Sequence, residues 1–172
     1  MTADMNQLGI LLGKINGSVV TAESCTGGFL ADLIVQTPGA SAWFAGGWVA
    51  YSNELKTRQL GIDEQLIEKN GAVSWQVAQA MCEGAVEQSG ATAAISTTGI
   101  AGPSGGTEEK PVGTVFIGCL FNGISTIREF RFSGDRLEIR SLAAYAALEM
   151  LRLELLGESV DMMCCQYGAT IG

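Results

Sequence analysis

Apolar and polar positions follow two periods along this chain, one typical of helices and one typical of strands. Apolar residues recur at helical spacing in six segments, which predicts helices over 5–15, 27–36, 53–60, 62–70, 74–89 and 135–156. Shorter apolar runs, rich in β-branched and aromatic residues, predict strands over 18–22, 42–51, 93–98, 114–120 and 124–132. The last two strands flank Asn122-Gly123, a dipeptide typical of hairpin turns. Residues 157–172 show no period, so no regular element is expected there.

The order of these elements indicates the fold class. Helices alternate with the early strands, which favours parallel pairing beneath covering helices, whereas the hairpin adds antiparallel strands. We therefore expect an α/β fold with helices on both faces of a mixed, largely parallel sheet. With 172 residues and no internal repeat or linker, the chain fits one domain over residues 1–156, followed by a tail, 157–172, of unknown role.

Composition narrows the partners and the compartment. The net charge of −8 argues against nucleic-acid binding, which usually requires a basic face. No apolar run approaches the ~18 residues of a membrane span, and the first residues lack the pattern of a signal peptide. The five cysteines form no C-x-x-C pair and are expected to be reduced. We therefore expect a cytoplasmic protein that binds neither nucleic acid nor membrane.

The absence of histidine limits the chemistry that the chain can perform. A sequence without histidine excludes the Ser-His-Asp triad, the Cys-His dyad and every zinc site with a histidine ligand. A general base must then be a lysine, a carboxylate, a tyrosine or a thiolate. The only lysines are Lys14, Lys56, Lys69 and Lys110.

Ser24 occupies a position that suits a nucleophile. It follows a predicted buried strand and precedes a predicted helix, so it is expected at the carboxyl edge of the sheet, where ligands bind in open α/β folds. Gly27 and Gly28 would allow a substrate to approach the backbone, and N–H groups at the helix start could hold an oxyanion. By position alone, capping of the helix by Ser24 or Thr26 is an equally good interpretation.

Lys56 and Tyr51 lie at the next strand–helix junction. A lysine acts as a base only if burial or a nearby cation lowers its pKa toward neutrality, and most helical lysines are solvated instead. Tyr51 could relay a proton or orient the lysine, or it could be a core aromatic residue. Cys25, beside Ser24, is an alternative nucleophile that ranks lower without a histidine to activate it.

A glycine-rich segment, 98–113 (TGIAGPSGGTEEKPVG), follows the predicted strand 93–98. Its many backbone N–H groups and small side chains suit contact with phosphate or sugar, although a flexible surface loop is the alternative. Its spacing matches neither the P-loop nor the dinucleotide-binding fingerprint. Arg136, at the start of the last helix, could clamp a phosphate or form a salt bridge there.

Five segments together resemble one family. TAESCTGG at 21–28, VAYSNELK at 49–56, GAVS at 71–74, TGIAGPSGGTEEKPVG at 98–113 and SGDR at 133–136 are similar to motifs of the CinA C-terminal (competence/damage-inducible) family. The resemblance covers roughly residues 5–155. It implies a three-layer α/β/α sandwich, with residues 1–156 as a CinA C-terminal-like amidohydrolase domain.

The resemblance also implies an activity and a set of site residues. The family's activity is that of a nicotinamide-nucleotide amidase, which converts nicotinamide mononucleotide to nicotinate mononucleotide and ammonia and so recycles NAD. Ser24 matches its nucleophile, Lys56 its base and Tyr51 a supporting residue, while a late arginine matches Arg136 or, one turn along, Arg140. The expected substrate-binding residues are Cys25, Thr26, Gly27, Gly28, Thr98, Gly99, Gly102, Gly105, Gly106 and Arg136.

On this reading the chain needs no metal and no cofactor. Its partner is expected to be a small-molecule nucleotide, and it is expected to form a homo-oligomer. Two alternatives stay open: a pyridine-nucleotide or ADP-ribose binding module without turnover, and an amidase with a different substrate.

Overall fold

The computed structural model describes residues 5–165 and 170–171, and the predicted helices and strands are all present in it. The helices are α1 (Met5–Lys14), α2 (Phe29–Val35), α3 (Asn53–Leu60), α4 (Glu64–Asn70), α5 (Trp75–Ser89) and α6 (Arg136–Leu156), with 3₁₀ helices η1 (Ala40–Ala42) and η2 (Val160–Cys165). The strands are β1 (Val19–Glu23), β2 (Phe44–Val49), β3 (Ala93–Gly99), β4 (Thr114–Phe121), β5 (Ile124–Arg131) and β6 (Thr170–Ile171).

The strands form one mixed sheet in the order β2-β1-β3-β4-β5-β6. β1 pairs in parallel with β2 and β3, whereas β3–β4, β4–β5 and β5–β6 are antiparallel. The parallel part is therefore smaller than the predicted largely parallel sheet. A parallel pair needs a long crossover, usually a helix. The connection from β3 to β4 carries no helix, and β4 returns to β5 through the predicted hairpin turn.

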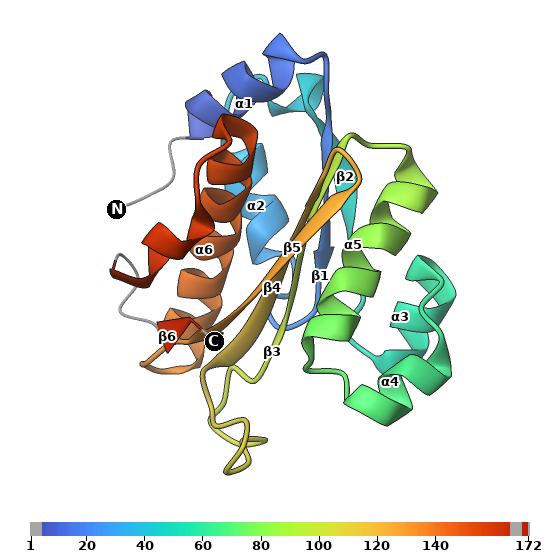
Figure 1. Cartoon of the computed structure of the whole chain (residues 1–172), viewed down its shortest axis with the longest axis vertical. Coiled ribbons are helices and arrows are strands. Elements are labelled where there is room, and N and C mark those ends of the chain that lie inside the picture. The colour runs from blue at the N-terminus through green and yellow to red at the C-terminus, as the bar shows by residue number, and fades with distance from the viewer. Residues whose placement is uncertain (1–4, 166–169, 172) are drawn as a thin grey trace.

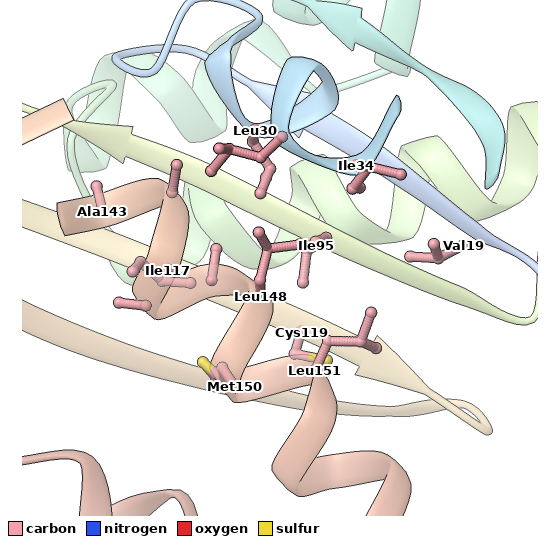
Figure 2. Close-up of a cluster of buried hydrophobic side chains, with 14 of the residues drawn as sticks. Val19, Leu30, Ile34, Ile95, Ile117, Cys119, Ala143, Leu148, Met150 and Leu151 are labelled. Carbon is pink, nitrogen blue, oxygen red and sulfur yellow. The ribbon is translucent and has the colours of Figure 1, made fainter. Parts of the chain in front are cut away.

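Helices cover both faces of the sheet, as predicted. α1, α2 and α6 lie on one face and α3, α4 and α5 on the other (Figure 1). Side chains such as Leu30, Ile117 and Leu148 fill the core between the sheet and the α2–α6 layer (Figure 2). A second core, containing Met81 and Leu120, lies under α5. The fold is thus a three-layer α/β/α sandwich.

The tail contains regular structure that its sequence did not predict. In η2, Val160 and Met163 are buried, and Arg128 of β5 forms an ion pair with Asp161 at 3.0 Å. β6 pairs with the end of β5 and extends the sheet by one short strand. Elements this short show no periodicity, because contacts with the finished sheet define them. Residues 166–169 and 172 of the predicted tail, like residues 1–4, lie outside the described part of the chain.

The parallel strands bring three connecting segments to one edge of the sheet. β1, β2 and β3 run in the same direction, so the segments after Glu23, Val49 and Gly99 leave the sheet at the same end. In Figure 1 this is the lower end, where the glycine-rich loop extends beyond the strands. Ser24, Lys56 and the glycine-rich loop therefore meet at this edge.

Candidate active site

The structure brings Ser24 and Lys56 into direct contact. Lys56 Nζ donates hydrogen bonds to Ser24 Oγ at 3.1 Å and to the carbonyl oxygen of Ala50 at 2.9 Å. The lysine is 1% exposed, the largest side chain among the fully buried residues described. Burial lowers its pKa below the usual 10.5, and only the nearby Cys25 opposes this. A lysine with a lowered pKa beside a serine hydroxyl can accept the hydroxyl proton.

α3 holds Lys56 in this position. Ser52 is the N-cap of the helix and accepts a hydrogen bond from Leu55 N at 3.1 Å. Lys56 and Leu60, one helical turn apart, are the two buried residues of the helix and face the protein interior. The alternative of a solvated helical lysine is therefore wrong for Lys56, because its face of α3 turns toward α5 and the protein interior rather than toward water.

Glu23, rather than Ser24 or Thr26, caps α2. The Glu23 carboxylate is fully buried and accepts hydrogen bonds from Gly28 N, Leu30 N and Ala31 N at 2.9, 3.0 and 2.9 Å. The capping interpretation of Ser24 and Thr26 is therefore wrong, and the first N–H groups of the helix are already occupied. A glutamate at the end of the otherwise uncharged strand VVTAE is the sequence signal for this role.

Further hydrogen bonds hold the segment that carries the nucleophile. Ser24 N donates to the carbonyl of Thr97 at 2.9 Å, which continues the β1–β3 pairing by one residue. Thr26 and Thr97 share a buried hydrogen bond between their hydroxyl groups at 2.7 Å. Arg140 Nη2 donates to the carbonyl of Thr26 at 2.6 Å. Ser24 is thus presented by a braced turn rather than by a mobile loop.

A pocket of about 220 Å³ opens onto the dyad. Its walls include seven predicted site residues: Ser24, Cys25, Tyr51, Lys56, Thr98, Gly99 and Arg136. Four residues that were not predicted complete it: Asn53, Ala72, Val73 and Ala101. The other predicted residues do not line it: Thr26, Gly27, Gly28, Gly102, Gly105 and Gly106. The structure therefore collects the catalytic candidates in one place but only part of the predicted substrate-binding set.

Cys25 lines the pocket but is poorly suited to attack. Burial raises the pKa of its thiol to about 12, and the negative charge of Glu23 adds to the rise. The thiol is therefore protonated at neutral pH, and the thiolate is the nucleophilic form. Between the two neighbouring candidates, the geometry and the protonation state favour Ser24.

Arg136 and Tyr51 meet at the mouth of the pocket. Arg136 Nη1 donates to the carbonyl of Gly102 at 2.7 Å, and Nη2 donates to the Tyr51 hydroxyl at 2.9 Å. Neither acceptor is a carboxylate, so the helix-start salt bridge considered for Arg136 is absent. Tyr51 is 56% exposed, which excludes the core-aromatic interpretation. Arg140 contacts the segment before α2 instead, so Arg136 is the arginine that lines the pocket.

Comparison with known protein families identifies the family of the chain. Residues 3–155 match the model of the CinA C-terminal domain. The chain belongs to the CinA C-terminal family. The fold of this CinA domain is similar to a CinA superfamily protein from Klebsiella pneumoniae, with 31% identity, a TM-score of 0.85 and coverage of 89% of this chain and 96% of that one. The competence/damage inducible protein from Agrobacterium tumefaciens is 38% identical, with a TM-score of 0.82 and coverage of 88% and 94%.

Curated relatives of the CinA domain are longer than the chain. A CinA-like protein from Thermotoga sp. (strain RQ2) is 52% identical over 147 residues, which cover 86% of this chain and 36% of that protein. A CinA-like protein from Citrifermentans bemidjiense is 48% identical over 151 residues, covering 88% and 36%. The chain therefore spans about a third of the length of these relatives.

The glycine-rich loop of the CinA domain is pinned to the pocket wall by two side chains. Thr98 Oγ1 donates to the carbonyl of Ala72 at 2.7 Å, and Lys110 Nζ donates to the carbonyl of Val73 at 2.6 Å. These bonds argue against a freely flexible surface loop. Sequence reasoning missed Ala72 and Val73 as pocket residues, although they lie in the GAVS segment that carries part of the resemblance, and it did not predict the contact of Lys110 with Val73.

A second hollow adjoins the pocket of the CinA domain. It has a volume of about 450 Å³ and shares Ala101 and Arg136 with the dyad pocket. Its remaining walls are largely apolar: Pro103, Val112, Gly134, Asp135 and Leu137. Arg136 therefore lines both spaces, where it can reach a ligand that occupies either of them.

Groups of metal-ligating side chains and membrane-spanning helices were both sought among the described residues. Within 5–165 and 170–171, no three His, Cys, Asp or Glu side chains are grouped so that they could hold a metal ion. No helix in this part of the chain is long and apolar enough to cross a membrane.

Proposed function

We propose that this CinA domain hydrolyses the carboxamide of nicotinamide mononucleotide, giving nicotinate mononucleotide and ammonia. The contact between Lys56 Nζ and Ser24 Oγ carries the proposal, because it joins a nucleophile to a buried base at a pocket. Lys56 has no anionic partner among the described residues, since its acceptors are a hydroxyl and a carbonyl. Both the burial and the uncharged partners favour the neutral amine that the reaction requires.

The reaction has two stages, acylation of Ser24 and hydrolysis of the acyl-enzyme, and each stage needs two proton transfers. Neutral Lys56 takes the Ser24 proton as the oxygen attacks the carboxamide carbon, which forms a tetrahedral intermediate. Lys56 then returns the proton to the leaving nitrogen, so the C–N bond breaks, ammonia departs and an acyl-Ser24 ester remains. A water molecule, activated by the same amine, attacks this ester and releases the carboxylate and the free serine.

The oxyanion requires donors that are not already used. Gly27 N donates to the carbonyl of Ser24 at 3.1 Å, and Gly28 N donates to Glu23, so neither is available. Among the described residues, neither Cys25 N nor Thr26 N donates to another residue, but Thr26 is fully buried and does not line the pocket, whereas Cys25 lines it. We assign the oxyanion to the N–H group of Cys25, and such a donor is worth about 3 kcal/mol in the transition state. The predicted donor segment, 25–28, thus narrows to its first residue, Cys25.

The two adjoining spaces support a nucleotide rather than free nicotinamide. A volume of about 220 Å³ is small beside the roughly 300–1,000 Å³ of pockets for drug-sized ligands. It suits the pyridine carboxamide, with the ribose beside Thr98 and the phosphate at Arg136, where the larger hollow begins. An arginine presents paired donors that match phosphate oxygens. Contacts from Gly102, Gly105 and Gly106 stay predictions, as do the homo-oligomer and the cytoplasmic location.

Ammonia release from nicotinamide mononucleotide, measured beside free nicotinamide, tests the proposal. We expect the wild-type domain to release ammonia from the mononucleotide far faster than from nicotinamide, and Ser24→Ala to release none. A Ser24→Ala variant with wild-type turnover would refute it. Binding of the mononucleotide without any ammonia release would favour a non-catalytic binding module, and turnover of other carboxamides alone would favour a different amidase.

A further inference from the structure

Glu23 is a buried carboxylate that the proposed reaction does not use. It ends β1, directly before Ser24, and its side chain is fully buried. Its two oxygens accept three backbone hydrogen bonds, from residues five, seven and eight positions further along the chain. A buried charge is costly unless several donors compensate it, so this carboxylate is held in one place.

The capping arrangement differs from the usual one. A helix N-terminus is normally capped by a Ser, Thr, Asp or Asn at the N-cap position itself. In α2 that position is Gly28, which has a left-handed φ of 94° and makes no side-chain cap. The carboxylate reaches the helix from the strand on the other side of Ser24, and it thereby closes the turn 24–28 on itself.

This closure determines which N–H groups face the reacting carbon. Glu23 engages the amides of Gly28, Leu30 and Ala31, while the amide of Cys25, which lines the pocket beside Ser24, donates to no other residue among those described. An anionic part of a ligand therefore finds the start of α2 already occupied by a carboxylate. In this turn, the amide of Cys25 remains as a donor at the pocket.

We propose that Glu23 is a positioning residue for the nucleophile. Its carboxylate holds the turn 24–28 so that Ser24 Oγ and the N–H group of Cys25 address the same carbon. The inference rests on the Ser24–Lys56 chemistry proposed above, but it does not depend on which carboxamide is the substrate. A displacement of about 1 Å in such a site can reduce the rate by about a hundredfold.

An alkyl fluorophosphonate tests this independently of the substrate. Ser24 Oγ attacks phosphorus, the P–O bond forms, the P–F bond breaks, fluoride leaves and Lys56 takes the serine proton. The phosphonylated protein is measured by intact mass over time, which gives both a rate and a final stoichiometry. The variant is Glu23→Gln, whose amide has a single oxygen and places an NH₂ group against a backbone N–H.

Glu149→Gln is the matched control. Glu149 is also a buried carboxylate, 6% exposed, and its oxygens accept hydrogen bonds from Arg152 at 2.8 Å. It lies thirteen residues beyond Arg136 on α6, about 20 Å along the helix axis from the pocket end. Both substitutions disturb a buried carboxylate and its partners, but only one of them touches the turn that carries Ser24.

We expect Glu23→Gln to be labelled completely but about a hundredfold more slowly, and Glu149→Gln to keep the wild-type rate. With nicotinamide mononucleotide as substrate, kcat of Glu23→Gln should fall while KM stays near the wild-type value. A purely structural role would instead lower the fraction labelled and leave the rate unchanged, and that result would overturn the proposal. So would a wild-type labelling rate in Glu23→Gln.

Two results separate this inference from the proposed function. If the wild-type domain is labelled at Ser24 at a rate that depends on Glu23, but releases no ammonia from the mononucleotide, the proposed substrate is wrong and the role of Glu23 is supported. A wild-type domain that is not labelled at Ser24 overturns both. If Glu23→Gln does not fold, Glu23→Asp is the test variant, because it keeps the charge but withdraws both oxygens by one methylene. Slow but complete labelling of Glu23→Asp would support the proposal, and a wild-type labelling rate would refute it.

Discussion

Lys56 Nζ lies 3.1 Å from Ser24 Oγ, although the two residues are 32 positions apart in the chain. The second acceptor of the amine is the carbonyl of Ala50, at 2.9 Å, so both partners of Lys56 are uncharged. A buried lysine without an anionic partner loses its proton more easily than one in a salt bridge. The contact therefore allows Lys56 to act as a base, although lysine side chains are usually solvated.

Lys56→Arg should strongly reduce turnover, although it places a permanent positive charge at this position. Arginine stays protonated at any accessible pH and cannot accept the Ser24 proton. General-base contributions are typically worth about 10²–10⁴-fold, so we expect ammonia release to fall by about a thousandfold. Fluorophosphonate labelling should fall in parallel. A Lys56→Arg variant within tenfold of the wild type would contradict the assignment of Lys56 as the base.

The pH dependence of labelling should report the neutral form of Lys56. Because the amine must be deprotonated to act, the rate should rise with pH through the pKa of Lys56. Burial holds that pKa below the usual 10.5, so the midpoint should lie at a lower pH than for an ordinary lysine. The measurement is the labelling rate between pH 6 and 10 with buffers of constant ionic strength. A rate that does not change over this range would contradict the prediction.

Folding stability should carry the same signature. The pKa of Lys56 is lower in the folded state than in the unfolded chain, so between the two values the unfolded chain binds more protons. The free energy of unfolding then rises with pH across this window and levels off above about 10.5, the unfolded value. Lys56→Met lacks this rise. The difference between wild type and Lys56→Met, measured by urea unfolding from pH 7 upward, should therefore shift in favour of the wild type.

Arg136 and Arg140 should separate substrate binding from positioning of the nucleophile. Hydrogen bonds to charged groups are worth about 1.5–3 kcal/mol, so Arg136→Ala should lower kcat/KM for the mononucleotide by roughly 10–100-fold. With the phosphate-free riboside, it should have little effect. Arg140→Ala releases the carbonyl of Thr26 and should slow both substrates equally. Equal losses for Arg136→Ala on the two substrates would contradict a phosphate contact.

Gly113, which joins the glycine-rich loop to the sheet, should not tolerate a side chain. It has a φ of 96°, and a Cβ there would overlap the carbonyl oxygen of Phe132. Left-handed strain of about 1–2 kcal/mol and overpacking of about 1–3 kcal/mol together predict a loss of roughly 3 kcal/mol for Gly113→Ala. Gly123→Ala is the control, since its φ of 75° is also left-handed but its Cβ would meet open space. Urea unfolding of both variants measures the difference.

Most of the fold could be predicted from local patterns, and the exceptions have clear causes. Periodicity located all six α-helices of the described residues and the first five strands, because burial on one face of an element repeats with its own geometry. The extent of parallel pairing was overestimated, since it depends on how β3 and β4 are connected in space. β6 was missed because a strand of two residues is defined by its partner, β5, rather than by its own sequence.

The candidate site was only partly predictable. Ser24 could be singled out because a strand followed by glycines and a helix marks a sheet edge. Lys56 looked unremarkable by position alone, since its burial depends on how α3 packs. Lys110 contacts Val73 across 37 positions, and Thr98 contacts Ala72 across 26 positions. No local pattern reveals these contacts at the pocket wall.

By itself, the sequence determined the layers of the sandwich, the position of Ser24 at a strand end and, through the lack of histidine, the need for another kind of base. Those conclusions depend on near neighbours and on composition, which a sequence contains in full. The tertiary structure decided that Lys56 is buried beside Ser24, that Arg136 rather than Arg140 lines the pocket, and that Glu23 occupies the amides of α2. Burial and hydrogen-bond partners arise only when distant segments pack together, and they decide which groups stay available for chemistry.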